Sequence, residues 1–137
     1  MKRITFISKV FFLLLTFSFS NCQDSTAQKQ ATQSAVLAAD DFEAKLALPN
    51  IQIVDVRTPD EYKAGHIGNA ININFYDADF KAQMAKLDKS KPLAVYCGVG
   101  GRSAKAAAIV SELGFKTVYD LQGGMSVWRS KGKKEVK

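Results

Sequence analysis

PLAVYCGVGGRS, residues 92–103, is the stretch that decides the fold. Its first part, Leu93–Tyr96, is a short continuous apolar run, which is typical of a strand buried on both faces of a parallel sheet. A glycine-rich turn follows, and a helix is predicted from about Arg102 to Leu113, with Gly114 as its stop. A buried strand that passes through a tight turn into a helix is a building unit of α/β proteins.

Outward from this unit, the sequence alternates between strand and helix patterns. Three more strands are predicted at residues 51–56, 70–74 and 117–119. Apolar residues at helical spacing predict one helix over 77–87, and Gly123-Gly124 precedes another that carries Trp128. We expect an α/β three-layer sandwich around a central, mainly parallel five-stranded sheet.

The folded domain is predicted to begin near Val36 with a short helix. Asp40, followed by Glu43 three residues later, has the spacing of a capping box. Phe42 and Leu46 then supply an apolar face, and Pro49 ends the pattern. Residues 36–131 are therefore expected to form one domain, with a basic tail over 132–137 that we expect to be solvated and frayed.

The first residues have the pattern of an export signal. Lys2, Arg3 and Lys9 lie around and before an apolar run over 10–19, which is too short for a comfortable transmembrane helix. Residues 1–21 are predicted to be a signal peptide. The small polar residues 22–35 without apolar periodicity are predicted to be a flexible tether.

Two cleavage sites remain open for this signal. Cys22 follows the apolar run directly, in a loose version of the motif of bacterial lipoproteins, which predicts a lipidated Cys22 on the periplasmic side of a membrane. Several acyl chains would anchor the protein firmly. Cleavage after Ala27 would instead release a soluble periplasmic protein. Contact with the membrane is expected only through the lipid anchor.

The net charge and the few histidine and cysteine residues argue against nucleic-acid binding and against a metal site. The formal net charge of the 137 residues is +6; without Lys2, Arg3 and Lys9, 16 of the 19 basic residues remain against 13 acidic ones, a net of +3. This is too little to indicate nucleic-acid binding. One histidine and one free cysteine do not make a convincing metal site, so neither metal nor other cofactor is expected.

Cys97 is predicted to be the working group. If Cys22 is lipidated, Cys97 is an isolated thiol in an exported protein. An unpaired thiol in an exported protein indicates a chemical role. It lies at the carboxyl end of a predicted strand, where ligands bind in open α/β sheets. The following glycines let backbone amides point inward, and the helix start adds a positive dipole end. Such a setting stabilises the thiolate, whereas a buried core cysteine would be inert. The predicted anion pocket consists of Gly98, Val99, Gly100, Gly101, Arg102 and Ser103.

Four segments resemble the signatures of the rhodanese family. They are VDVRTPDEY at 54–62, GHIGNA at 65–70, YCGVGGRS at 96–103 and GGMSVW at 123–128. The resemblance implies a sulfurtransferase that moves a sulfane sulfur from thiosulfate or a persulfide donor to cyanide, a thiol or a protein acceptor. The carrier of this sulfur would be a Cys97 persulfide.

Two alternatives to a sulfurtransferase remain open. A non-enzymatic persulfide carrier or binding module would use the same persulfide. A phosphatase or arsenate reductase of related fold is disfavoured by loop length. Cell-cycle phosphatases, which resemble the rhodanese fold, have five residues between the cysteine and the arginine. Here four residues separate Cys97 from Arg102. The larger two-domain members of the family have more basic residues around the site, whereas this loop contains only glycine and valine between Cys97 and Arg102. The resemblance therefore leaves free thiosulfate and a protein-bound or small-thiol persulfide open as donors.

Other residues receive smaller predictions. Asp55 is expected to organise the loop, and Arg57 to pair with Glu61 or another nearby carboxylate. His66 is expected to be structural rather than a general base. Arg102 would either contact the anion or hold the loop, and the sequence does not choose. Ser103 would donate a hydroxyl hydrogen or begin the helix, and Trp128 is expected in the core.

Overall fold

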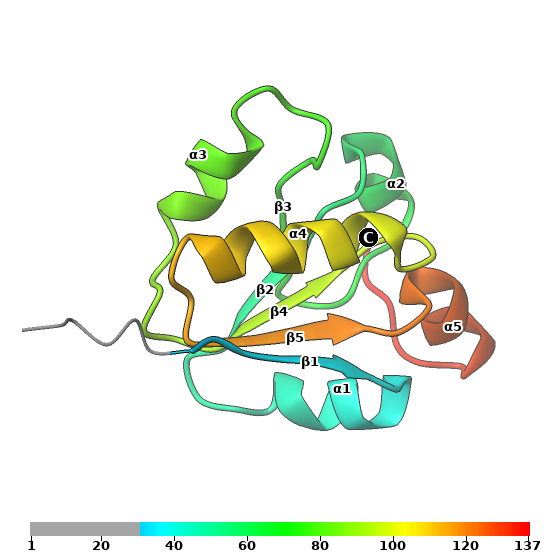
Figure 1. Ribbon diagram of the computed structural model, residues 1–137. Coiled ribbons are helices and arrows are strands. Elements are labelled where there is room, and N and C mark those ends of the chain that lie inside the picture. Colours follow the sequence, from blue (N-terminus) through cyan, green and yellow to red (C-terminus); the bar gives the residue numbers. More distant parts are fainter. Residues whose placement is uncertain (1–30) are drawn as a thin grey trace, which may run out of the picture.

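Five parallel strands form one sheet in the order β1-β5-β4-β2-β3 in the computed structural model, which describes residues 31–137 (Figure 1). The predicted signal peptide, Cys22 and Ala27 lie outside the described residues. The strands are β1 (Gln33–Leu37), β2 (Gln52–Asp55), β3 (Ile71–Asn72), β4 (Leu93–Tyr96) and β5 (Thr117–Leu121). The helices are α1 (Ala39–Leu46), α2 (Pro59–Ala64), α3 (Phe80–Ala85), α4 (Gly101–Glu112) and α5 (Gly124–Ser130).

Helices cover both faces of the sheet, so the predicted three-layer α/β sandwich is confirmed. Figure 1 shows α4 along one side of the strands and α1 along the other. One core cluster joins Val95 of β4 to Met84 of α3 and Val110 of α4. A second cluster on the opposite face joins Ala94 of β4 to Phe42 of α1 and Trp128 of α5. Trp128 is thus a core residue, as expected.

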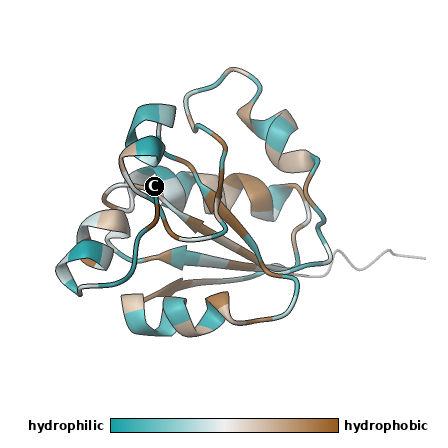
Figure 2. Ribbon diagram, turned by 180° about the vertical axis from the view of Figure 1, so that it is seen from behind, coloured by the Kyte–Doolittle hydropathy of each residue, from teal (hydrophilic) through white to brown (hydrophobic). Residues whose placement is uncertain are grey.

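Strand β4 is apolar along its whole length because it has neighbours on every side. It pairs in parallel with β2 and β5, and all four of its residues are buried. Figure 2 shows the hydrophobic residues concentrated on the central strands. This central position explains why residues 93–96 give the clearest strand pattern in the sequence.

The domain begins earlier than residue 36. Residues 33–35 belong to β1, which pairs with β5 from Gln33 opposite Thr117 to Leu37 opposite Leu121. These residues were expected in the tether because they are small and polar. β1 lies at the edge of the sheet, and none of its residues is fully buried. Its position is therefore determined by backbone pairing with β5 and not by an apolar sequence pattern.

The carboxyl-terminal tail is docked, which corrects the expectation of a frayed end. Val136 forms an antiparallel bridge with His66, and the indole nitrogen of Trp128 donates to the carbonyl oxygen of Lys134 at 3.0 Å. Lys133 forms ion pairs with both Asp40 and Glu43 of α1. Backbone hydrogen bonds and paired charges therefore hold residues whose composition alone suggests disorder.

The same ion pairs replace the capping box predicted at residues 40–43. The N-cap of α1 is Ala38, which makes no side-chain capping hydrogen bond. A capping box occurs instead at α2, where Thr58 and Glu61 exchange side-chain and backbone hydrogen bonds. Within residues 31–137, no helix is both long enough and apolar enough to cross a membrane.

Candidate active site

Cys97 lies at the end of β4, in the four-residue turn that leads into α4. The backbone amide of Gly100 donates to the Cys97 sulfur at 3.1 Å. Gly100 has a φ of 99°, a left-handed conformation that favours glycine, and this conformation begins the helix. Cys97 has no exposed surface, whereas Val99 at the tip of the turn is 76% exposed. The loop therefore closes over the sulfur.

The surroundings of Cys97 favour the thiolate. Burial raises the pKa of the thiol, but hydrogen bonds from the Ser103 hydroxyl and from the amides of Ser103, Gly100 and Val99 lower it more. The net effect is a lowered pKa, in agreement with the anion pocket expected from the sequence. Ser103 is completely buried, and its hydroxyl also donates to the Gly100 carbonyl oxygen at 3.2 Å. Ser103 therefore lies in the first turn of α4, which begins at Gly101, with its hydroxyl on the side of the Cys97 sulfur.

The start of α5 holds the loop from the opposite side. The amides of Met125 and Ser126 donate to the carbonyl oxygens of Cys97 and Gly98 at 2.8 and 2.9 Å. Gly124 has a φ of 55°, and a Cβ atom there would overlap the Cys97 carbonyl group. Only glycine allows α5 to approach this closely, which explains why the GGMSVW segment accompanies the cysteine loop.

Arg102 holds the loop through Glu61 of α2. Its two terminal nitrogens donate to the two oxygens of the Glu61 carboxylate, each at 2.8 Å. Hydrogen bonding from Arg102 lowers the pKa of Glu61 to about 2, although burial opposes this shift. The guanidinium also lies over the ring of Tyr76, 5.7 Å from its centroid. Of the two roles that the sequence left open, the loop-holding contact is the one observed.

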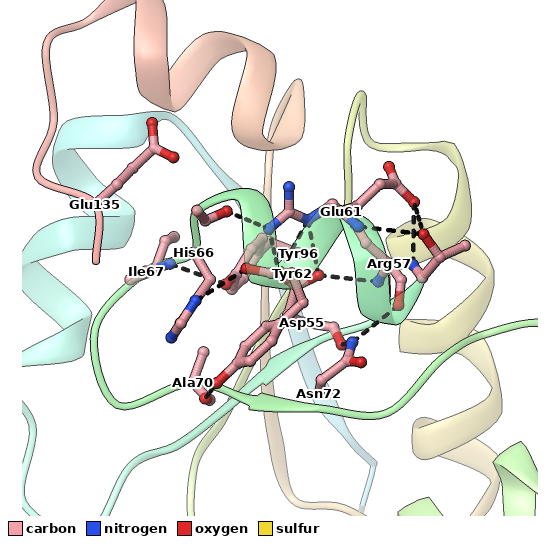
Figure 3. Close-up of polar contacts among 12 residues, drawn as sticks. Asp55, Arg57, Glu61, Tyr62, His66, Ile67, Ala70, Asn72, Tyr96 and Glu135 are labelled. Atoms are coloured by element: carbon pink, nitrogen blue, oxygen red, sulfur yellow. Dashed lines mark hydrogen bonds and ion pairs between the residues drawn. The ribbon is translucent and has the colours of Figure 1, made fainter. Parts of the chain in front are cut away.

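Asp55 and Arg57 form a buried ion pair beside the loop, so the carboxylate that Arg57 was expected to pair with is Asp55 and not Glu61. Arg57 donates from its amide and its guanidinium to the Asp55 carboxylate, the shortest contact being 2.6 Å, and to the Gly65 carbonyl oxygen at 2.7 Å (Figure 3). Asp55 is the last residue of β2, and Arg57 follows two residues later. Through its bond to Gly65, Arg57 connects the end of β2 to the segment that follows α2.

Tyr96 and His66 complete the polar cluster drawn in Figure 3. The Tyr96 hydroxyl accepts from the Ile67 amide at 3.0 Å, and burial together with the negative charge of Asp55 raises its pKa. The His66 ring stacks on Tyr62, 3.8 Å between ring centroids, and its Nδ1 lies 3.1 Å from the Tyr62 carbonyl oxygen. These contacts give His66 the structural surroundings that were expected.

An open depression of about 400 Å³ lies over the loop. Of the residues singled out in the sequence, Gly98, Val99 and Arg57 line it, whereas Gly100, Gly101, Arg102 and Ser103 do not. It is also lined by residues that sequence reasoning did not place there: Glu61, Ala64, Met125, Ser126 and Arg129. The Thr-x-x-Glu capping pattern was a signal for the helix of Glu61, but not for its contact with Arg102. Across residues 31–137, no three His, Cys, Asp or Glu side chains are grouped to hold a metal ion.

Comparison with known proteins places this architecture in a family. The family model described as rhodanese-like domain matches residues 38–131, and the chain belongs to this family. The thiosulfate sulfurtransferase GlpE of Coxiella burnetii (strain RSA 493 / Nine Mile phase I) is 41% identical over 81 residues, which cover 59% of this chain and 74% of that protein. The protein of the same name from Pseudomonas aeruginosa (strain LESB58) is 41% identical over 80 residues, which cover 58% of this chain and 70% of that protein.

Solved structures show the same fold. The rhodanese-related protein of Thermoplasma volcanium has a TM-score of 0.66 and 32% identity, over 74% of this chain and 96% of that one. The BH2092 protein of Bacillus halodurans has a TM-score of 0.63 and 29% identity, over 80% of each chain. The resemblance seen in the sequence motifs is therefore confirmed at the level of family and fold.

Proposed function

We propose that this protein is a sulfurtransferase that carries a sulfane sulfur on Cys97. One observation supports the proposal above all others. The Cys97 sulfur accepts a hydrogen bond from the Gly100 amide at the N-terminus of α4, and Ser103 and Val99 provide further donors around it. Such an arrangement stabilises a sulfur anion before any substrate arrives. The names of the GlpE relatives support the same chemistry.

The reaction consists of two displacements at sulfur. In the first, the Cys97 thiolate attacks the outer sulfur of the donor; the new S–S bond forms as the donor's own S–S bond breaks, and sulfite or a thiolate leaves with the bonding pair. In the second, an acceptor thiolate or cyanide attacks the outer sulfur of the Cys97 persulfide. The Cys97 sulfur leaves with the electron pair, so the thiolate is regenerated and no external oxidant or reductant is needed.

The charges near the loop favour a persulfide over free thiosulfate as the donor. Arg57 and Arg129 line the depression, and Arg102 follows the loop. Each of these arginines is paired with a carboxylate: Arg57 with Asp55, Arg102 with Glu61, and Arg129 with Glu135. Paired guanidinium groups attract a small dianion less than free ones. We therefore expect a higher kcat/KM with a low-molecular-weight persulfide than with thiosulfate, measured at equal ionic strength.

Substitution of the cysteine tests the assignment. Cys97→Ser should abolish both thiocyanate formation from thiosulfate and cyanide and the mass gain of one sulfur on the Cys97 peptide. The thermal unfolding temperature should change little, because the side chains are nearly the same size. Cys22→Ala is the matched control and should retain both signals. A Cys97→Ser variant that keeps the wild-type rate would overturn the mechanism.

The same assay separates an enzyme from a persulfide carrier. An enzyme forms many molecules of thiocyanate per molecule of protein, whereas a carrier stops after a single transfer unless a partner protein accepts the sulfur. Single turnover with a full mass gain on Cys97 would favour the carrier. Multiple turnovers with small thiols would favour the enzyme.

Loop length separates sulfur transfer from phosphate chemistry. Four residues between Cys97 and Arg102 form a ring suited to one sulfur, whereas a tetrahedral oxyanion needs donors at about 2.7–2.9 Å from several oxygens. The wild-type protein should not hydrolyse aryl phosphates, and insertion of one residue after Gly100 should weaken persulfide formation. Cys97-dependent phosphatase activity without any sulfur uptake would replace the sulfurtransferase assignment.

We also propose that the protein is exported and lipidated at Cys22, on the basis of the residues around the apolar run at 10–19. The mature chain should then begin at a lipid-modified Cys22 and partition with membranes, and Cys22→Ala should release it or leave it unprocessed. Mass spectrometry of the purified mature protein makes this distinction. A soluble chain that begins at Gln28 would show ordinary cleavage after Ala27 instead.

A further inference from the structure

A buried carboxyl group lies beneath the cysteine loop. Asp120 of β5 is 3% exposed and is paired in register with Val95 of β4, two residues before Cys97. Side chains alternate along a strand, and Val118, two residues before Asp120, packs in the cluster on the α4 face. The Asp120 side chain therefore points toward the first turn of α4, which contains Ser103.

The contacts of Asp120 are unusual for an ionised carboxylate. Its Oδ1 is buried and has no hydrogen-bond partner among residues 31–137, and its side chain faces the turn of α4 that contains Ser103. A buried carboxylate without a cation is costly, and such groups bind a proton instead. Burial accordingly raises the pKa of Asp120, and the nearby Ser103 hydroxyl offsets this only in part.

The Ser103 hydroxyl has one hydrogen and three acceptors around it. These are the Cys97 sulfur, the Gly100 carbonyl oxygen at 3.2 Å and the Asp120 carboxyl group. An ionised Asp120 would take the Ser103 hydrogen for itself. A protonated Asp120 donates to the Ser103 oxygen instead, which leaves the Ser103 hydrogen to be shared between the Gly100 carbonyl oxygen and the sulfur.

We propose that Asp120 is a positioning residue that, as a neutral acid, donates to Ser103 and so keeps the Ser103 hydroxyl hydrogen available to the Cys97 sulfur. This inference rests on the proposed function, because it concerns the thiolate that attacks the donor and leaves from the persulfide. Asp120 itself touches neither the sulfur nor a substrate. Its effect is to add a donor to the sulfur anion through an intervening hydroxyl.

Few charged groups share this environment. On α4, which packs over Asp120, Lys105 and Glu112 are exposed, whereas Arg102 interacts with the Cys97 thiolate and is paired with Glu61. On the flanking strands, β1 has no charged residue, and the neighbouring Tyr96 of β4 lies in the core cluster of the opposite face. The variants below leave all these groups in place.

The pH dependence of alkylation at Cys97 tests the proposal without relying on sulfur transfer. Iodoacetamide reacts with the thiolate, and peptide mass spectrometry of the full chain separates Cys97 from Cys22. We expect Ser103→Ala to raise the apparent pKa of Cys97 by about one unit, a tenfold loss of alkylation rate below that pKa. Asp120→Leu, which fills the space without a donor, should lose about threefold because Ser103 then has no fixed orientation.

Two comparisons make the result decisive. Asp120→Asn stays neutral and keeps an N–H donor, so it should recover the rate that Asp120→Leu loses. In the Ser103→Ala background, Asp120→Leu should cause no further loss of alkylation rate, because Asp120 acts on the sulfur only through the Ser103 hydroxyl. Asp41→Asn, an exposed carboxyl on α1, is the control and should leave the profile unchanged.

Three outcomes would overturn the proposal. They are an Asp120→Leu profile equal to the wild type, an Asp120→Asn loss as large as that of Asp120→Leu, or additive losses in the double variant. Circular dichroism of each variant shows whether it folds, and the Asn variant keeps the test valid if the Leu variant does not. Absence of a sulfur mass gain in the wild type would overturn the proposed function alone, because the alkylation profiles would still report on Asp120.

Discussion

Two neighbouring strands of this sheet, β4 and β2, each end at a group that can carry a negative charge, and different partners surround the two groups. At the end of β4, the Cys97 sulfur is surrounded by backbone amides and a hydroxyl. At the end of β2, the Asp55 carboxylate is held by the Arg57 guanidinium, and both side chains are almost completely buried. The first region stabilises a negative charge with dipoles, and the second neutralises it with an opposite charge.

The difference explains what each region is suited to do. Amide dipoles stabilise an anion without covering every lone pair, so the sulfur remains able to form and break bonds. A bidentate ion pair fixes the positions of both side chains. Removal of either partner leaves a buried unpaired charge and so destabilises the fold. The loop is therefore suited to chemistry, and the Asp55–Arg57 pair to holding the segments around it.

The largest effect on stability is expected from breaking the buried pair. Asp55→Asn should lower the free energy of unfolding by about 3–5 kcal/mol, because the Arg57 charge would remain buried without a counterion. Urea denaturation measures the change. Asp60→Asn on α2 removes an exposed carboxylate close by in the sequence and should change stability by less than about 0.5 kcal/mol. Equal effects of the two substitutions would show that Asp55 is not a structural joint.

A smaller loss is expected where α5 meets the loop. Gly124→Ala introduces a Cβ atom that overlaps the Cys97 carbonyl group at a left-handed φ, so it should cost more than about 2 kcal/mol and reduce sulfur uptake. Gly132→Ala has a similar φ of 65° but open space around the added atom, and should cost only about 1 kcal/mol. Thermal unfolding together with the mass gain on Cys97 checks both variants. If the two variants behave alike, close packing against Cys97 is not what requires Gly124.

The smallest effect is expected from the half-exposed pair of Glu61 and Arg102. The folded pKa of Glu61 is about 2, below its ordinary value of 4.5, so folding favours the ionised form. Its contribution to stability is present above pH 4.5 and is lost as the pH falls from 4.5 to about 2. Because the side chain is 38% exposed, this contribution should be about 0.5–1 kcal/mol.

Glu61→Gln removes this acid-dependent contribution. Relative to the wild type, its stability should be lower at neutral pH and nearly equal near pH 2, as measured by urea denaturation across this range. A constant difference at every pH would show that the hydrogen bonds, and not the charge of Glu61, connect α2 to the loop.

Local sequence patterns were sufficient for the central elements and for the position of Cys97 between a buried strand and a helix. β4 has a continuous apolar run and β2 a nearly continuous one because both are buried in the centre of the sheet, and the glycine turn after Tyr96 needs no distant partner to be recognised. The edge strand β1 was missed because its sequence is polar and only its pairing with β5 places it. The catalytic role of Cys97 remains a prediction for the experiments above.

The sequence by itself determined the family, the parallel sheet and the position of one thiol before a helix, since each depends on residues close together in the chain. The tertiary structure alone decided the partners of the charged side chains. Arg102 meets Glu61 across 41 positions, Lys133 reaches α1, and Asp120 lies under Ser103. A carboxylate can pair with any cation that the fold brings near it, so these contacts depend on how strands and helices pack and leave no periodic pattern in the sequence.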